Sequence, residues 1–170
     1  MAGIDERRLS EIRDRASAAS PGPWILGEAV DDRFIINTAR SDGRRLRIMR
    51  DLQPAGEGDV QFIAMARELI PRLLDVIETQ AFDEVTTEDL DLFDEVVANA
   101  SAGPWTAFIE DEQPIGGCSV IWAGDDPDGR DLYVWLDDEI APAADFRFVA
   151  AARTDIPELL YEVRTSIADN

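Results

Sequence analysis

The sequence contains no histidine and no lysine, and it has a single cysteine, Cys118. Without histidine, the chain lacks the usual general base near neutral pH, the commonest metal ligand and every Ser-His or Cys-His catalytic arrangement. One cysteine permits no intrachain disulfide, and in an apolar strand it is typical of a small core residue. Glycine-rich phosphate loops are absent too. We therefore expect a protein without catalytic activity and without cofactor or metal.

Long apolar runs are also absent. No run approaches the roughly 20 residues that a membrane span requires, and the first eight residues lack the apolar stretch of a signal peptide. We expect a cytoplasmic protein that does not associate with membranes.

Acidic residues outnumber basic ones, 36 to 16, which gives a net charge of −20. Residues 1–80 hold 14 acidic and 12 basic groups (net −2), whereas residues 81–170 hold 22 and 4 (net −18). Such a surface repels nucleic acid and attracts basic protein surfaces, whose association it accelerates at low salt. The charge predicts a basic protein partner and no direct nucleic acid binding. Alternatively, the acidity serves only solubility or a salt-rich cytoplasm.

The chain also repeats itself. A Ser-x-Gly-Pro-Trp motif ends at Trp24 and again 81 residues later at Trp105, and an Asp-x-x-Phe block begins at Asp59 and again 86 residues later at Asp145. The five-residue difference falls where turn residues are dense and insertions cost least. This pattern predicts two α+β units, residues 1–80 and 81–170, packed with pseudo-twofold symmetry about one interface.

Each unit reads as an opening helix, a three-stranded antiparallel meander and a bent closing helix. Apolar residues at helical spacing predict the opening helices, with Asp5 and either Thr86 or Thr87 as caps. The glycine of each Ser-x-Gly-Pro-Trp motif should stop the helix in a left-handed turn. Strands are predicted after each motif tryptophan and at residues 34–38, 46–49, 118–123 and 132–136. Pro71 and Pro157 predict that each closing helix is a short helix followed by a longer one.

The Ala-Ser-Pro-Gly-Pro-Trp segment (Ala19 to Trp24), followed by the Asp-x-x-Phe-Ile-Ala-x-Ala-Arg-x-x-Ile-Pro-x-Leu-Leu block (Asp59 to Leu74), resembles a set of small uncharacterised proteins of actinobacteria and their phages. The resemblance covers most of each half, and the second copy departs from it at Ala102 and Asp155. It implies single helix-meander-helix units in a phage or mobile-element setting, and no catalytic residues.

An aromatic face in the second hairpin, with acidic residues beside it, is the predicted partner-binding site. Aromatic residues are enriched at interface hot spots, and the first unit has Ile36 or Asn37 and Ile48 near the corresponding places. The Asp-rich run after Trp122 lacks the spacing and the distal glutamate of an EF-hand, so a hairpin turn is the better interpretation. The predicted residues are Trp122, Trp135, Asp125, Asp126, Asp128, Asp137, Asp138 and Glu139.

An alternative site is a small-ligand pocket between the two units, lined by Trp24, Trp105, Arg67 and Arg153. A structural interpretation competes with it. The tryptophans would seal the core, each arginine would pair with an acid or a carbonyl, and Asp59 and Asp145 would be helix N-caps.

The leading hypothesis is thus a non-catalytic interaction protein that binds, and can inhibit, a basic protein, as immunity proteins, antitoxins or phage anti-defence inhibitors do. The competing hypotheses are a binder of a small anion or nucleotide between the units, and a structural unit of a mobile element. The oligomeric state stays open.

Overall fold

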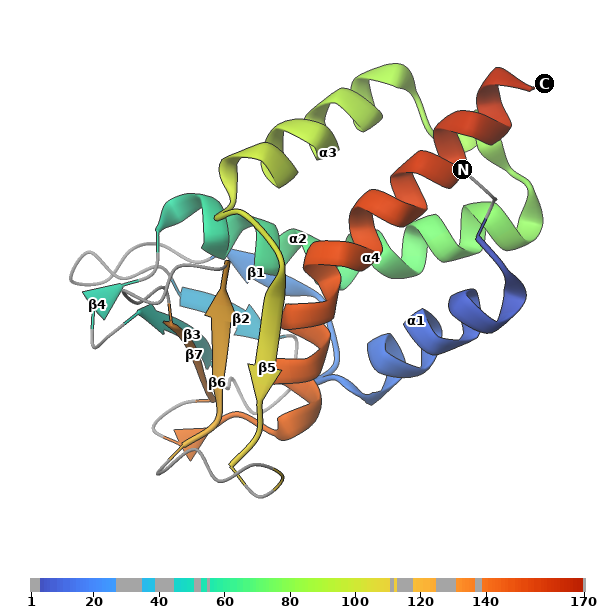
Figure 1. Cartoon of the computed structure of the whole chain (residues 1–170). Helices are drawn as coiled ribbons and strands as arrows, with labels where there is room; N and C mark the ends of the chain where they lie inside the picture. The colour runs from blue at the N-terminus through green and yellow to red at the C-terminus, as the bar shows by residue number, and fades with distance from the viewer. Residues whose placement is uncertain are drawn as a thin grey trace.

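The computed structural model describes residues 4–26, 35–38, 45–50, 53–54, 56–110, 112, 118–124, 131–136 and 139–169. Over these residues the protein combines four α-helices, one 3-10 helix (η1, Phe82–Glu84) and eight strands (Figure 1). The predicted α+β class is confirmed.

The opening helices α1 (Glu6–Ala18) and α3 (Thr87–Asn99) begin at predicted caps. The Asp5 carboxylate accepts from the Arg8 N–H at 2.7 Å, and the Thr86 hydroxyl accepts from the N–H of Asp89, whose carboxylate accepts from the Thr86 N–H in return. This capping box satisfies two free amides at the start of α3.

Neither opening helix ends in a left-handed glycine. The capping residues, Ala19 and Ala100, are already extended, and Gly124 is the only described glycine with a positive φ. The predicted left-handed turns at Gly22 and Gly103 are therefore wrong. Both glycines precede a cis proline peptide, and an arginine side chain lies close beside each of them.

The closing helices α2 (Glu57–Thr79) and α4 (Ala143–Ala168) continue through their prolines without interruption. The predicted division of each into a short and a longer helix is wrong. A proline inside a helix costs about 3 kcal/mol, whereas burial of one large apolar side chain contributes about 1.5–3 kcal/mol. Several such side chains are buried around each proline: Ile70, Leu73 and Leu74 in α2, and Ile156, Leu159 and Leu160 in α4. None of the described helices has the length and apolar character to cross a bilayer.

The strands form one antiparallel sheet with the order β1-β2-β3-β7-β6-β5. Strands β1 (Trp24–Leu26), β2 (Ile35–Thr38) and β3 (Arg45–Arg50) pair in succession, as do β5 (Trp105–Phe108), β6 (Val120–Ala123) and β7 (Asp131–Leu136). Their ends lie within two residues of the predicted ones. Two short strands were not predicted: β4 (Gln53–Pro54) pairs with β3, and β8 (Glu139–Ile140) with β7.

The two halves of the chain meet in the middle of this sheet, where β3 pairs with β7 and Ile48 lies opposite Val134. The helices gather on one side of the sheet (Figure 1). Along β7, the fully buried Leu132 and Val134 alternate with the half-buried Asp131, Tyr133 and Trp135. Alternation along a strand separates two faces, so the sheet has a core face under the helices and an outer face.

Replacement of Val134 by aspartate should destabilise both halves together. An unpaired carboxylate at this fully buried central position should lower the free energy of unfolding by about 3 kcal/mol or more. We expect urea unfolding, followed by circular dichroism, to show a single transition at lower urea. Thr106→Asp, on an exposed position of β5, is the control and should change the midpoint little. Two separate transitions in either variant would contradict a shared central sheet.

Candidate functional site

The segment that follows each opening helix is held by an aspartate from the other half of the chain. The N–H and hydroxyl of Ser20 donate to the two Asp145 oxygens at 2.6 and 2.8 Å. The N–H and hydroxyl of Ser101 likewise donate to the two Asp59 oxygens at 2.6 and 2.8 Å. We call these contacts the serine latches. The N-cap positions of α2 and α4 belong to Gly56 and Pro142, so the predicted N-cap role of Asp59 and Asp145 is wrong.

An arginine completes each latch from the same half as its serine. Arg67 Nε donates to the Ser20 carbonyl at 2.9 Å, and Arg153 Nε donates to the Ser101 carbonyl at 3.0 Å. Pairing of each arginine with a carbonyl was one of the structural interpretations, and it is confirmed. Burial lowers the pKa of both guanidinium groups, while the aspartate of the same latch acts in the opposite direction.

The motif glycines make room for these arginines. A Cβ atom added at Gly22 would lie 3.1 Å from Cγ of Arg67, and one at Gly103 would lie 3.1 Å from Cγ of Arg153. Contacts this short require the neighbour to move, so glycine allows the arginine stem to pass close to the backbone.

Trp24 and Trp105 close the core beside the latches. Trp24 meets Phe148 edge-on, with ring centroids 5.5 Å apart, and Trp105 meets Phe62 in the same way at 5.4 Å. Each of these phenylalanines belongs to the other half, and both tryptophans are almost fully buried. Large aromatic surfaces of this kind stabilise a core. Structural contacts therefore account for both tryptophan rings.

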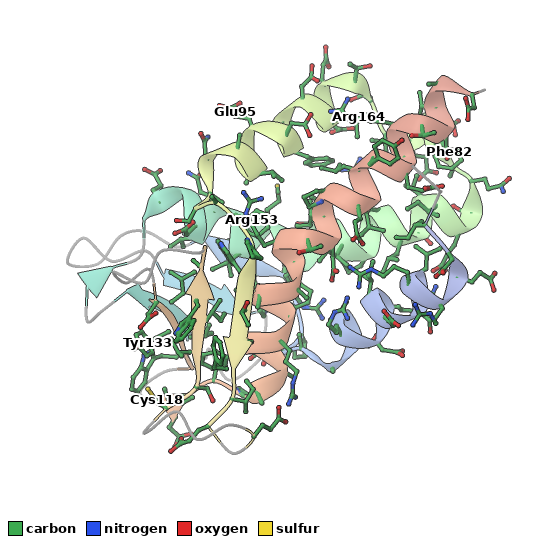
Figure 2. All side chains as sticks on the ribbon, viewed as in Figure 1. Phe82, Glu95, Cys118, Tyr133, Arg153 and Arg164 are labelled. Atoms are coloured by element: carbon green, nitrogen blue, oxygen red, sulfur yellow. The ribbon has the colours of Figure 1, made fainter. Side chains whose placement is uncertain are left out.

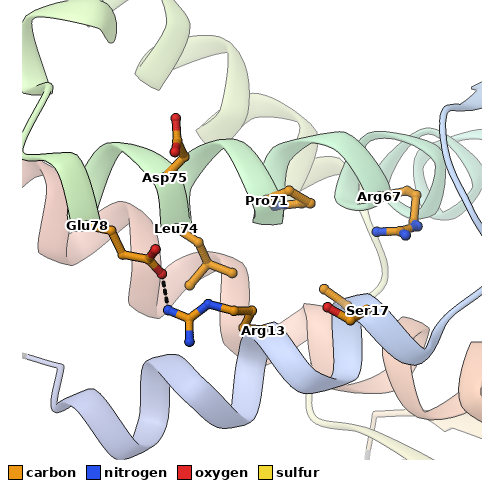
Figure 3. A pocket seen from close by; sticks show the side chains of 8 residues that line it. Arg13, Ser17, Arg67, Pro71, Leu74, Asp75 and Glu78 are labelled. Carbon is orange, nitrogen blue, oxygen red and sulfur yellow. Dashed lines mark hydrogen bonds and ion pairs between the residues drawn. The ribbon is translucent and has the colours of Figure 1, made fainter.

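A pocket of about 300 Å³ lies between α1 and α2 (Figure 3). Arg13 and Glu78 form an ion pair at one end of it, and Arg67 lies at the other end, near Ser17. Of the four residues predicted for a ligand site between the units, only Arg67 lines this pocket. The structure thus places Trp24 with Arg67 and Trp105 with Arg153 in two separate clusters, each occupied by a latch.

The outer face of the sheet carries the predicted partner residue Trp122. This side chain is 47% exposed and stacks on Phe108 of β5, with ring centroids 4.3 Å apart and planes at 48°. Strand pairing places Thr106 and Asp131 opposite Trp122. Sequence reasoning missed Phe108, although the alternation along β5 from the buried Trp105 places it on this face. We call Phe108, Trp122, Tyr133 and Trp135 the outer aromatic face, of which Figure 2 labels Tyr133.

The remaining predicted partner residues are placed in part. Trp135 is half-buried on β7 and lies four residues beyond Asp131, which is opposite Trp122. The two tryptophans are therefore separated by roughly 13 Å along the strand direction. Glu139 is exposed in β8. Asp125, Asp126, Asp128, Asp137 and Asp138 lie outside the described residues. Cys118 is half-buried just before β6.

A buried carboxylate also joins α1 to α4. Asp155 accepts from Arg8 at 2.7 Å and from Arg15 at 3.0 Å, and Arg8 reaches Glu158 at 2.8 Å. Only 2% of the Asp155 surface is exposed. Burial raises the pKa of Asp155, and this effect exceeds the opposite effect of Arg15 and Arg8.

Comparison of the chain with protein-family models, with curated proteins and with solved structures gives no match in any of the three. The similarity to small actinobacterial and phage proteins stays a prediction.

Loss of one latch hydroxyl should weaken the fold measurably. Ser20→Ala or Ser101→Ala removes a donor from a carboxylate buried at the junction, which should lower the free energy of unfolding by about 1–3 kcal/mol. Ser17→Ala, at an exposed position of α1, is the matched control and should be close to neutral. Urea unfolding of the three variants makes the comparison. Equal stability of all three would show that the latch hydroxyls contribute nothing.

Asp155 should make stability depend on pH in a specific direction. Because its pKa in the folded protein is raised above the ordinary 3.8, its contribution is fully present below pH 3.8 and is lost as the pH rises through the folded pKa. The difference in unfolding free energy between wild type and Asp155→Asn should therefore shift against wild type as the pH rises. Glu68→Gln, at an exposed position of α2, controls for general charge effects. A shift in favour of wild type would mean that the two arginines outweigh burial.

Proposed function

We propose that this chain is a non-catalytic interaction protein whose second half binds a basic surface of another protein through the outer aromatic face and its acidic neighbours. The observation that carries the proposal is Trp122. Nearly half of this side chain is exposed, and Phe108 supports it, whereas Trp24 and Trp105 are buried in the core. An exposed tryptophan packed against an aromatic residue of the neighbouring strand is the kind of anchor that dominates binding energy at interfaces.

The charge of the second half supports a basic partner. Residues 81–170 carry 22 acidic and 4 basic groups, and the acidic segment Asp137-Asp138-Glu139 directly follows β7, the strand of Trp135. Negative charge around an apolar centre steers a positive surface into contact and repels unsuitable partners. An inhibitor of the immunity, antitoxin or phage anti-defence type would use such a surface.

We further propose that the chain is a tandem duplication whose two units pack about a pseudo-twofold axis. The register of the central strands supports this proposal. Ile48 and Val134 are 86 residues apart, the offset of the second repeated block, and they pair with each other. A twofold axis through this pair would exchange the two units, and the reciprocal exchange of aspartates in the serine latches agrees with such an axis.

Under this alignment the outer aromatic face belongs to the second unit alone. Trp24 pairs with Thr38, and Trp105 pairs with Ala123, so Thr38 corresponds to Ala123. The residue before each of these is Asn37 in the first unit and Trp122 in the second. The offset of 86 makes Met49 the counterpart of Trp135. Because the buried latches are shared and these residues are not, partner binding would have arisen in the second unit after duplication.

A photoreactive benzophenone side chain at position 122 tests the proposal in a lysate of the host. We expect this side chain to capture a basic protein. The control carries the same group at position 92, where Leu92 is 56% exposed on the acidic helix α3. It should capture none. With the captured protein purified, Trp122→Ala should weaken binding at least about tenfold, and Leu92→Ala should not.

A separate measurement tests the electrostatic contribution to association with the partner. Reversal of Asp137, Asp138 and Glu139 to arginine should slow association with the purified partner, and added salt should slow the wild type in the same way. Equal capture at positions 122 and 92, or an association rate that neither salt nor the reversal changes, would refute the proposal.

A further inference from the structure

The contacts between the two units repeat with their charges reversed. On one side, Arg8 of α1 pairs with Glu158 of α4 at 2.8 Å. On the other side, Asp89 of α3 pairs with Arg72 of α2 at 3.4 Å. Asp89 lies 81 residues after Arg8, and Glu158 lies 86 residues after Arg72, the offsets of the two repeated blocks. The same contact thus occurs twice, with the cation and the anion exchanged.

The buried acid of α4 also differs between the two units, but its counterpart carries no charge. Asp155 corresponds to Leu69, which is 2% exposed in α2. Its partner Arg15 corresponds to Val96, which packs against the core. The buried ion pair therefore joins the units on one side only, and the corresponding positions on the other side hold apolar residues.

We infer that these residues form a charge key by which the first unit pairs with the second and rejects another copy of itself. The inference rests on the proposed duplication. The serine latches and the Trp–Phe contacts are the same in both units, so they fit any combination of units equally well. The key residues are those that distinguish the combinations.

Unlike and like pairings differ at each key position. Two first units would place Arg8 opposite Arg72, and two second units would place Asp89 opposite Glu158. The second case would also leave the buried carboxylate of Asp155 facing Val96 and Asp89 without a cation, which is costly in a desolvated site. Only the unlike pairing joins opposite charges at both exposed pairs and keeps two cations beside Asp155.

Two further ion pairs hold each opening helix on its own closing helix. Arg13 of α1 pairs with Glu78 of α2, and Asp94 of α3 pairs with Arg164 of α4 at 2.6 Å. Figure 2 shows Arg164 between these two helices. These pairs are reversed in sign as well, but both partners belong to one unit. They would survive in any combination of units and so do not belong to the key.

The double variant Arg72→Glu/Glu158→Arg inverts the key without changing the net charge. Within one chain it places Arg8 opposite a second cation at position 158 and Asp89 opposite a second anion at position 72, whereas like units of two chains now join opposite charges. At low salt we expect the thermal midpoint to fall by about 4 °C or more. Light scattering should give a molar mass above that of the wild type, and this mass should increase with protein concentration. In 1 M NaCl both differences should shrink.

The control is Arg7→Glu/Glu68→Arg, which also leaves the net charge unchanged and alters two exposed residues of α1 and α2. It should keep the wild-type mass and midpoint. The single variant Arg72→Glu keeps the Arg8–Glu158 pair, so its midpoint should lie above that of the inverted variant and its mass should be lower.

The inference is overturned if the inverted variant has the mass of the control, or if its midpoint is no lower than that of the single variant Arg72→Glu. Neither result bears on partner binding through Trp122, which lies on the other side of the sheet. Failure of the key and failure of the proposed function are therefore distinguishable.

Discussion

The architecture depends on a buried carboxylate that each half of the chain inserts into the other. Asp59 and Asp145 are at most 4% exposed, and a carboxylate in such a place is costly unless donors surround it. The serine of the Ser-x-Gly-Pro-Trp motif provides a backbone and a hydroxyl donor. The glycine admits the arginine stem, and the tryptophan packs edge-on against a phenylalanine of the other half. One electrostatic requirement thus explains the motif as a unit.

Local rules predicted the elements of the fold, and contacts between distant residues decided what those rules missed. Helical spacing and the caps Asp5 and Thr86 located α1 and α3, and alternation located the hairpins. The proline rule failed at Pro71 and Pro157 because the buried residues around them outweigh one lost hydrogen bond. The N-cap interpretation of Asp145 failed because its partner, Ser20, lies 125 residues away in the sequence. No local pattern contains that information.

The part of the candidate site that depends on residue type could be predicted from the sequence. Trp122 was identified because the first half lacks an aromatic residue at the corresponding place, and it is exposed on the outer face. Its neighbour Phe108 was not identified, because the pairing of β5 with β6 sets that contact. The two faces of the sheet have different roles. The face under the helices joins the halves, which leaves the outer face open for the proposed partner.

On the proposed duplication, the contacts that both units share and the charges that differ between them would have different roles. Two units that share the same latches and aromatic contacts could pair with any other copy, so the features that stabilise the fold cannot choose the partner. Exposed ion pairs contribute little to stability, about 0–1 kcal/mol each, but they discriminate because the wrong combination exchanges attraction for repulsion. Asp155 sharpens this choice, since its desolvation makes a missing cation costly. On the proposed duplication, the polar contacts between the units, weak as sources of stability, carry the information about which unit belongs with which.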